Sequence, residues 1–142
     1  MVRAGDQKEG KITAVDASRL LIEYTYDRVV GKTLPKNNRW LMSKTIWDEA
    51  SNARSKLLRA NSIRVENYKE AVERLLLLKE AIGHLDALIA DIDTLHIKGI
   101  ISDSRSECWT GLATDMQNLV KGMLKANRRT YKEYLEKPGT GD

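Results

Sequence analysis

Apolar side chains recur every three or four residues along most of the chain, which is the spacing of an amphipathic α-helix. Leu20, Leu21, Tyr24, Val29 and Val30 belong to the first such stretch. The later stretches carry regular stripes, which are Ile46, Ala50, Ala53 and Leu57; Tyr68, Ala71, Leu75, Leu78, Ile82, Leu85, Ile89 and Ile92; and Trp109, Leu112, Met116, Leu119, Met123 and Ala126. The pattern predicts an all-α chain.

Capping and stop signals set the expected ends of four helices. Thr13 to Asp16 and Ser104 to Glu107 have the form of capping boxes, which begin helices. Gly31 is placed where a left-handed glycine would end the first helix, and Gly99 follows a basic residue at the end of the third. We expect helices over residues 14–30, 38–61, 67–97 and 104–137. Short connections would make them an antiparallel, up-down-up-down four-helix bundle.

Composition favours one domain. The chain has 142 residues, of which 42% are hydrophobic and 31% are charged, and this suits a single core. Residues 1–13 are expected to form a flexible polar leader, residues 14–137 the bundle, and residues 138–142 a disordered tail. In the first connection, Asn37 or Asn38 is expected to cap the second helix.

The chain shows no signal of a membrane or secreted protein. The longest aliphatic run, Leu75 to Leu78, is far too short to span a membrane. The polar stretch from Met1 to Gly10 has no apolar segment of a signal peptide, and the single cysteine, Cys108, has no partner for an internal disulfide. We expect a cytoplasmic location.

Some large apolar residues fall outside the stripes. Trp40, Trp47 and Leu58 form a second stripe on the second helix, and Leu76 and Leu77 point away from the main stripe of the third. A wide helix face that packs on two neighbouring helices would account for them equally well. Two tryptophans seven residues apart favour a subunit interface, so we expect a homo-oligomer.

Charge is unevenly distributed along the chain, whose net charge is +4. Residues 31–64 carry eight basic and two acidic side chains, whereas residues 65–103 carry four basic and eight acidic ones. On the fourth helix, Lys121, Lys125, Arg128 and Lys132 follow a 4-3-4 spacing with Arg129 beside them. We call these five residues the basic row, which the spacing places roughly opposite the apolar stripe.

The basic row is the expected nucleic-acid-binding surface, although helix exteriors are commonly charged simply because they are solvated. Lys56 and Arg59 on the second helix, and Lys36 and Arg39 near its start, would add to this surface. No base-reading motif is present, so binding would depend on phosphate contacts and on salt, with little sequence preference.

Catalytic and metal sites are not indicated. His84 and His96 are twelve residues apart on one helix, about 18 Å along its axis, so they cannot share an ion. Cys108 is expected to be a packing residue, and His96 a packed or cap-region residue. There is no glycine-rich phosphate loop or nucleophile elbow. We expect no enzyme activity, cofactor, metal or small-molecule substrate.

The segment Leu34-Pro35-Lys36-Asn37-Asn38-Arg39-Trp40, together with the order and length of the helices, resembles a known family. This is the family of pentameric four-helix-bundle proteins that includes Avd, the accessory variability determinant of diversity-generating retroelements, and the ribosomal-RNA intervening-sequence proteins. The second helix ends in Leu58-Arg59-Ala60-Asn61-Ser62 instead of the Asn-Ile-x-Glu-Gly of the intervening-sequence branch, which favours the Avd branch.

The resemblance implies a barrel-like homopentamer without catalytic residues of its own. It would bind a reverse transcriptase and its template-repeat RNA, and also DNA, and would support mutagenic cDNA synthesis. Lys36 and Arg39 match the family motif and would either contact nucleic acid or brace the loop. Two alternatives stay open: a helical adaptor that binds only proteins, and an intervening-sequence protein without a nucleic-acid role.

Overall fold

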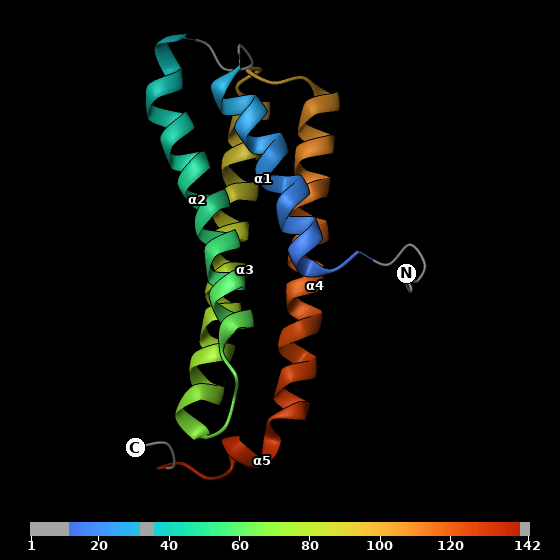
Figure 1. Cartoon of the computed structure of the whole chain (residues 1–142). Helices are drawn as coiled ribbons and strands as arrows, with labels where there is room; N and C mark the ends of the chain where they lie inside the picture. Colours follow the sequence, from blue (N-terminus) through green and yellow to red (C-terminus); the bar gives the residue numbers. More distant parts are fainter. Residues whose placement is uncertain (1–11, 32–35, 140–142) are drawn as a thin grey trace.

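The computed structural model describes residues 12–31 and 36–139, leaving aside the side chains of residues 36–41. These residues form five helices and no strand: α1 (Ala14–Val30), α2 (Lys36–Ser62), α3 (Tyr68–Ile97), α4 (Asp103–Thr130) and the single turn α5 (Lys132–Leu135). α1 and α3 each pack against both α2 and α4, and consecutive long helices are antiparallel (Figure 1). The prediction of an all-α chain with four long, mutually packed helices is confirmed.

Two of the predicted helix ends are confirmed in detail. The Thr13 hydroxyl accepts a hydrogen bond from the Asp16 amide at 3.1 Å, and the Thr13 amide donates to Asp16 Oδ2 at 3.4 Å, which completes a capping box. At the end of α3, Gly99 adopts a φ of 74°. The amide of Ile100 there donates to the Leu95 carbonyl at 2.9 Å, as in a Schellman motif.

Gly31 ends α1 as predicted, but not in the left-handed conformation. Its φ is −77°, which any residue can adopt, and its amide donates to the Asp27 carbonyl at 3.1 Å. A Cβ atom at this position would lie 2.6 Å from the same carbonyl oxygen. Glycine is therefore required here by the close approach of backbone and not by its dihedral angles.

Two predicted N-caps are wrong. α2 begins at Lys36, so Asn37 and Asn38 lie inside its first turn. α4 begins at Asp103, and its cap is Ser102, whose hydroxyl accepts from the Arg105 amide at 3.1 Å. An acidic residue in the first helical position is stabilised by the helix dipole, which favours this earlier start over Ser104.

The fourth helix does not continue to residue 137. α4 ends at Thr130, Tyr131 adopts φ −103° and ψ 21°, and α5 follows. The break lets Leu135 return to pack against the core, and α5 contacts α3 as well as α4. Covering the end of the bundle in this way is incompatible with a straight helix.

The core follows the predicted stripes on α2 and α3 more closely than on α4. Ile46, Ala50, Ala53 and Leu57 are all buried. On α3, Leu77 is also buried, at 5% exposure, so the expectation that it points away from the core is wrong. The buried stripe of α4 consists of Trp109, Ala113, Met116, Val120 and Leu124, whereas the predicted members Leu112, Leu119 and Met123 are only half-buried and Ala126 is exposed.

α1 is much shorter than the other long helices, with 17 residues against 27, 30 and 28. In Figure 1 it lies beside the N-terminal halves of α2 and α4. The C-terminal ends of α2 and α4 and the N-terminal end of α3 extend beyond it (Figure 1). The buried Trp109 Nε1–H donates to Thr25 Oγ1 at 3.0 Å and ties α4 to α1. Within the described residues, no helix is both long and apolar enough to cross a membrane.

Candidate nucleic-acid interface

The basic row lies on the solvent side of the end of the molecule that α1 does not cover. Lys121, Lys125, Arg128 and Arg129 are exposed on α4, and Lys132 is exposed on α5. At about 100° per residue, the row is centred about 120° from the buried stripe of α4 and not opposite it. The predicted position of the row was therefore wrong by about 60°, because the buried stripe was misassigned.

Three side-chain hydrogen bonds define the flank of α4 and its register with α3. Gln117 Nε2 donates to the Ile82 carbonyl at 3.2 Å and to Asp86 Oδ1 at 2.6 Å. Near the other end of this helix pair, Arg74 Nε donates to Asn127 Oδ1 at 2.5 Å. Since Gln117 precedes Lys121 by four residues and Arg128 by eleven, these two cations lie on the flank of α4 next to α3, whereas Arg129 lies about 100° further round toward solvent.

The same register brings a basic residue of α3 beside the row. Lys79 is exposed and follows the spacing of Ile82 and Asp86, three and seven residues away, so it lies on the side of α3 that faces α4. Antiparallel packing places it at the level of Lys121. Sequence reasoning missed Lys79, because only the contact between the two helices shows that it joins the row.

The positive charges of the row are largely unneutralised. Among the described residues, Lys121, Lys125, Arg128 and Arg129 form no ion pair, and Lys132 lies 4.0 Å from Glu136. A pair at that distance between exposed side chains contributes little, so even Lys132 keeps most of its field. The row can therefore attract a polyanion.

The structure places Lys56 and Arg59 of α2 away from the basic row. Lys56 Nζ is bound to Glu80 Oε1 of α3 at 3.2 Å, and only 26% of its side chain is exposed. Arg59 is exposed, but it belongs to α2, which lies diagonally across the bundle from α4. These two residues and the basic row thus occupy different sides of the molecule.

The side chains of Lys36, Arg39 and Trp40 lie outside the described residues, so their predicted roles are not tested. The backbone of α2 begins at Lys36, at the end of the bundle opposite the C-terminal end of α4 (Figure 1). Any contribution of Lys36 and Arg39 to binding would therefore come from a separate surface.

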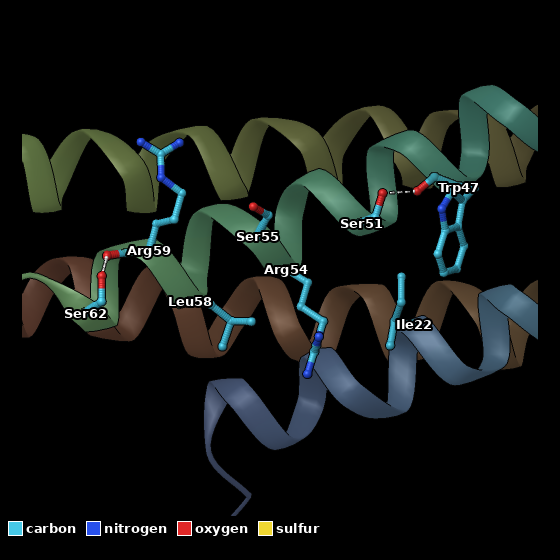
Figure 2. A pocket seen from close by; sticks show the side chains of 8 residues that line it. All are labelled: Ile22, Trp47, Ser51, Arg54, Ser55, Leu58, Arg59 and Ser62. Carbon is cyan, nitrogen blue, oxygen red and sulfur yellow. Dashed lines mark hydrogen bonds between the residues drawn. The ribbon is translucent and has the colours of Figure 1, made fainter.

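A shallow apolar groove runs between α1 and α2. Trp47 and Leu58 are 36% and 37% exposed and line it together with Ile22. Figure 2 shows Leu58 and Arg54 pointing from α2 toward α1, whereas Arg59 points away to the other side of α2. Arg54 Nε is buried without a hydrogen-bond partner. The predicted interface residues Trp47 and Leu58 therefore do share a surface, while Leu76, which is 52% exposed, lies apart from it on α3.

The histidines take part in pairs with carboxylates. His84 Nδ1 lies 2.8 Å from Glu49 Oε1, and His96 Nε2 lies 2.6 Å from Asp103 Oδ1, which places His96 in the cap region as expected.

Burial, together with the nearby Glu49 carboxylate, raises the pKa of Asp91. The described residues contain no group of three or more His, Cys, Asp or Glu that could hold a metal ion.

Cys108 is exposed, so its predicted packing role is wrong. It lies beside Tyr24, whose pKa is raised by burial first and then by Cys108. The Arg28 guanidinium lies 4.9 Å from the centre of the Tyr24 ring, and Trp109 meets that ring edge-on at 5.9 Å. This aromatic cluster fixes the contact between α1 and α4.

In comparisons with known proteins, no family model and no curated protein matches the chain. The likeness to the Avd family therefore stays a prediction based on the segment around Pro35 and on the helix order.

Proposed function

We propose that the chain is a non-catalytic nucleic-acid-binding protein that works as a homo-oligomer in support of a reverse transcriptase. The nucleic-acid part of the proposal is supported by the basic row. Its cations are exposed at the end of α4 and on α5, and among them only Lys132 lies near a carboxylate of the described part of the chain. Phosphate oxygens are the ligands that such a row attracts without regard to base sequence.

The geometry favours a backbone-binding mode. Lys121, Lys125 and Arg128 follow one another at about 6 and 4.5 Å along the axis of α4, and Lys79 widens the row from α3. A long, flexible Lys or Arg side chain at each of these points can follow a phosphate backbone whose bases are not read. RNA is the expected ligand, with DNA as a weaker one.

Self-association is the second part of the proposal and is supported by the groove between α1 and α2. Trp47 and Leu58 leave apolar surface in contact with water there, and Arg54 beside them forms no ion pair among the described residues. A closed ring of copies would repeat the basic row and turn several weak phosphate contacts into one strong site. The pentamer and the reverse transcriptase partner come from the family resemblance alone.

A salt-titrated binding experiment tests the nucleic-acid part. The triple variant Lys121→Glu, Lys125→Glu and Arg128→Glu should lower RNA affinity at low salt by at least about a hundredfold and flatten the dependence of affinity on salt, since each lost phosphate contact releases fewer counterions. Helical content measured by circular dichroism should not change, because all three positions are exposed.

The matched control is Arg64→Glu, Lys98→Glu and Arg105→Glu. It makes the same change of net charge at exposed positions outside the basic row. We expect it to weaken binding much less. Equal losses for both triple variants would mean that overall charge, and not the basic row, governs binding.

A second candidate function is a helical adaptor that binds only proteins. The exposed Trp47 and Leu58 in the groove favour it, since aromatic anchors are typical of protein interfaces. Such an adaptor would retain no RNA even at low salt, which separates the two functions in the same experiment.

A further inference from the structure

The break between α4 and α5 brings two tyrosines to the end of the basic row. Tyr131 is the residue at which the helix is interrupted, and Tyr134 follows on α5. Their ring centres are 6.5 Å apart and the ring planes are inclined by 45°. Tyr134 is 37% exposed. A helix that continued straight would direct these side chains differently, so this arrangement is a product of the break.

The inner ring of the pair is held from the side of the bundle. The Arg74 guanidinium lies 5.8 Å from the centre of the Tyr131 ring. Arg74 is itself fixed, because its Nη1 donates to the Ala60 carbonyl at 2.8 Å and its Nε donates to Asn127 at 2.5 Å. Leu135 anchors α5 by packing against the core. The Tyr134 ring is therefore presented on a supported turn and not on a free tail.

Exposed charged residues adjoin this aromatic pair along the chain, among them the basic Arg128, Arg129 and Lys132 and the acidic Glu133 and Glu136. Arg128 and Arg129 belong to the last turn of α4, and Lys132 opens α5. Neither arginine forms an ion pair among the described residues. Cations beside an exposed aromatic ring are the two elements that proteins combine to hold single strands: the cations contact phosphates, and the ring stacks on a base.

We propose that the corner formed by the end of α4 and by α5 binds single-stranded nucleic acid, with an unpaired base stacked on Tyr134 and the adjoining phosphates on Arg128 and Arg129. The inference rests on the proposed function and adds the class of ligand to it. The bases of a duplex are stacked on one another and cannot reach the ring, so a duplex would gain only the phosphate contacts.

Fluorescence anisotropy with an end-labelled oligouridine of about ten nucleotides, and with an RNA duplex of the same length, tests the proposal. The Tyr134→Leu variant should bind the single strand about tenfold more weakly than the unaltered chain does, while its affinity for the duplex stays the same. The dependence of affinity on salt should also stay the same, because no charge is removed. Tyr134→Phe keeps an aromatic ring and should keep the affinity.

Tyr26→Leu is the matched control. Tyr26 is 46% exposed on α1, and its ring meets Trp47 edge-on with 6.0 Å between the ring centres, away from the basic row. This variant should bind the single strand as the unaltered chain does. Circular dichroism of both leucine variants verifies that each is folded.

Two results would overturn the inference while leaving the proposed function standing. Either Tyr134→Leu binds the single strand as well as the unaltered chain does, or it loses affinity equally for the single strand and the duplex. If the unaltered chain retains neither RNA at low salt, the proposed function itself fails. An unchanged single-strand affinity in Tyr134→Leu combined with loss of binding to a protein partner would assign the ring to a protein contact.

Discussion

At the scale of single residues, Gly31 and Gly83 show how differently two glycines can be constrained. A Cβ at Gly31 would lie 2.6 Å from the Asp27 carbonyl oxygen, whereas a Cβ at Gly83, in the interior of α3, would have no atom within 4 Å. The backbone must shift to accept a side chain in the first case and not in the second. Neither fact can be seen in the sequence, where both residues are glycines near a helical pattern.

The two alanine substitutions should change stability in opposite directions. Gly31→Ala should lower the free energy of unfolding by about 1–2 kcal/mol, because the end of α1 must distort. Gly83→Ala should raise it by about 0.5–1 kcal/mol, because alanine has a lower entropic cost in a helix. Urea unfolding of both variants measures the difference. A stabilising Gly31→Ala would show that the end of α1 relaxes freely.

Asp91 offers a pH-dependent prediction. Burial and the nearby Glu49 raise its pKa in the folded chain, so the folded state binds this proton more tightly than the unfolded chain does. Its contribution to stability is therefore present at low pH. That contribution is lost as the pH rises from the ordinary pKa of 3.8 through the raised value in the folded chain.

Asp91→Asn removes this titration and should make the chain more stable at neutral pH, by less than about 1 kcal/mol for such a half-buried group. The advantage should vanish below pH 3.8. Thermal unfolding across pH measures it, and Asp93→Asn, at an exposed position of the same helix, is the control. A less stable Asp91→Asn at neutral pH would mean that the charge of Asp91 is favourable in the folded chain.

At the scale of helices, capping motifs and apolar spacing predict most boundaries because both are local. Thr13 and Gly99 act through hydrogen bonds within a few residues, and so the sequence predicts them. The buried stripe of α4 was misassigned for a different reason. The apolar residues of α4, including Leu112 and Leu119, cover a wide part of the helix surface. The positions of α1 and α3 decide which of these residues are buried.

Ser102 and Ser104 test the corrected start of α4. Ser102→Ala removes the hydroxyl that accepts from the Arg105 amide and should destabilise the chain by about 1 kcal/mol. Ser104→Ala should change stability by less than about 0.5 kcal/mol, because Ser104 is exposed inside the first turn. Chemical denaturation distinguishes them. A larger loss for Ser104→Ala would favour the capping box predicted from the sequence.

At the scale of the whole molecule, the sequence could predict a row of cations but not its surroundings. Lys121, Lys125 and Arg128 share a face because they share a helix. Contacts between helices place Lys79 beside them. Contacts between helices also keep Lys56 away from them, because Lys56 pairs with Glu80 of α3. A helical pattern fixes each helix's own faces, whereas register and neighbours are tertiary properties.

The self-association proposed from the groove between α1 and α2 can be tested by light scattering. We expect the unaltered chain at micromolar concentration to have several times the mass of the 16.1 kDa monomer. Leu58→Glu replaces apolar surface in the groove by a charge and should shift the mass toward the monomer, because the carboxylate must lose its hydration when an interface buries it, even beside Arg54. Ile97→Glu, at a position that is 73% exposed outside the groove, is the control.

The same variant separates assembly from nucleic-acid binding. Leu58→Glu leaves every residue of the basic row in place, so a monomeric variant should still bind RNA but about a hundredfold more weakly, since the rows of several copies no longer act together. An unaltered chain that is monomeric at micromolar concentration would contradict both expectations. In that case a single basic row, with Lys79 beside it, would have to account for all of the affinity, and the salt dependence would correspond to only a few phosphate contacts.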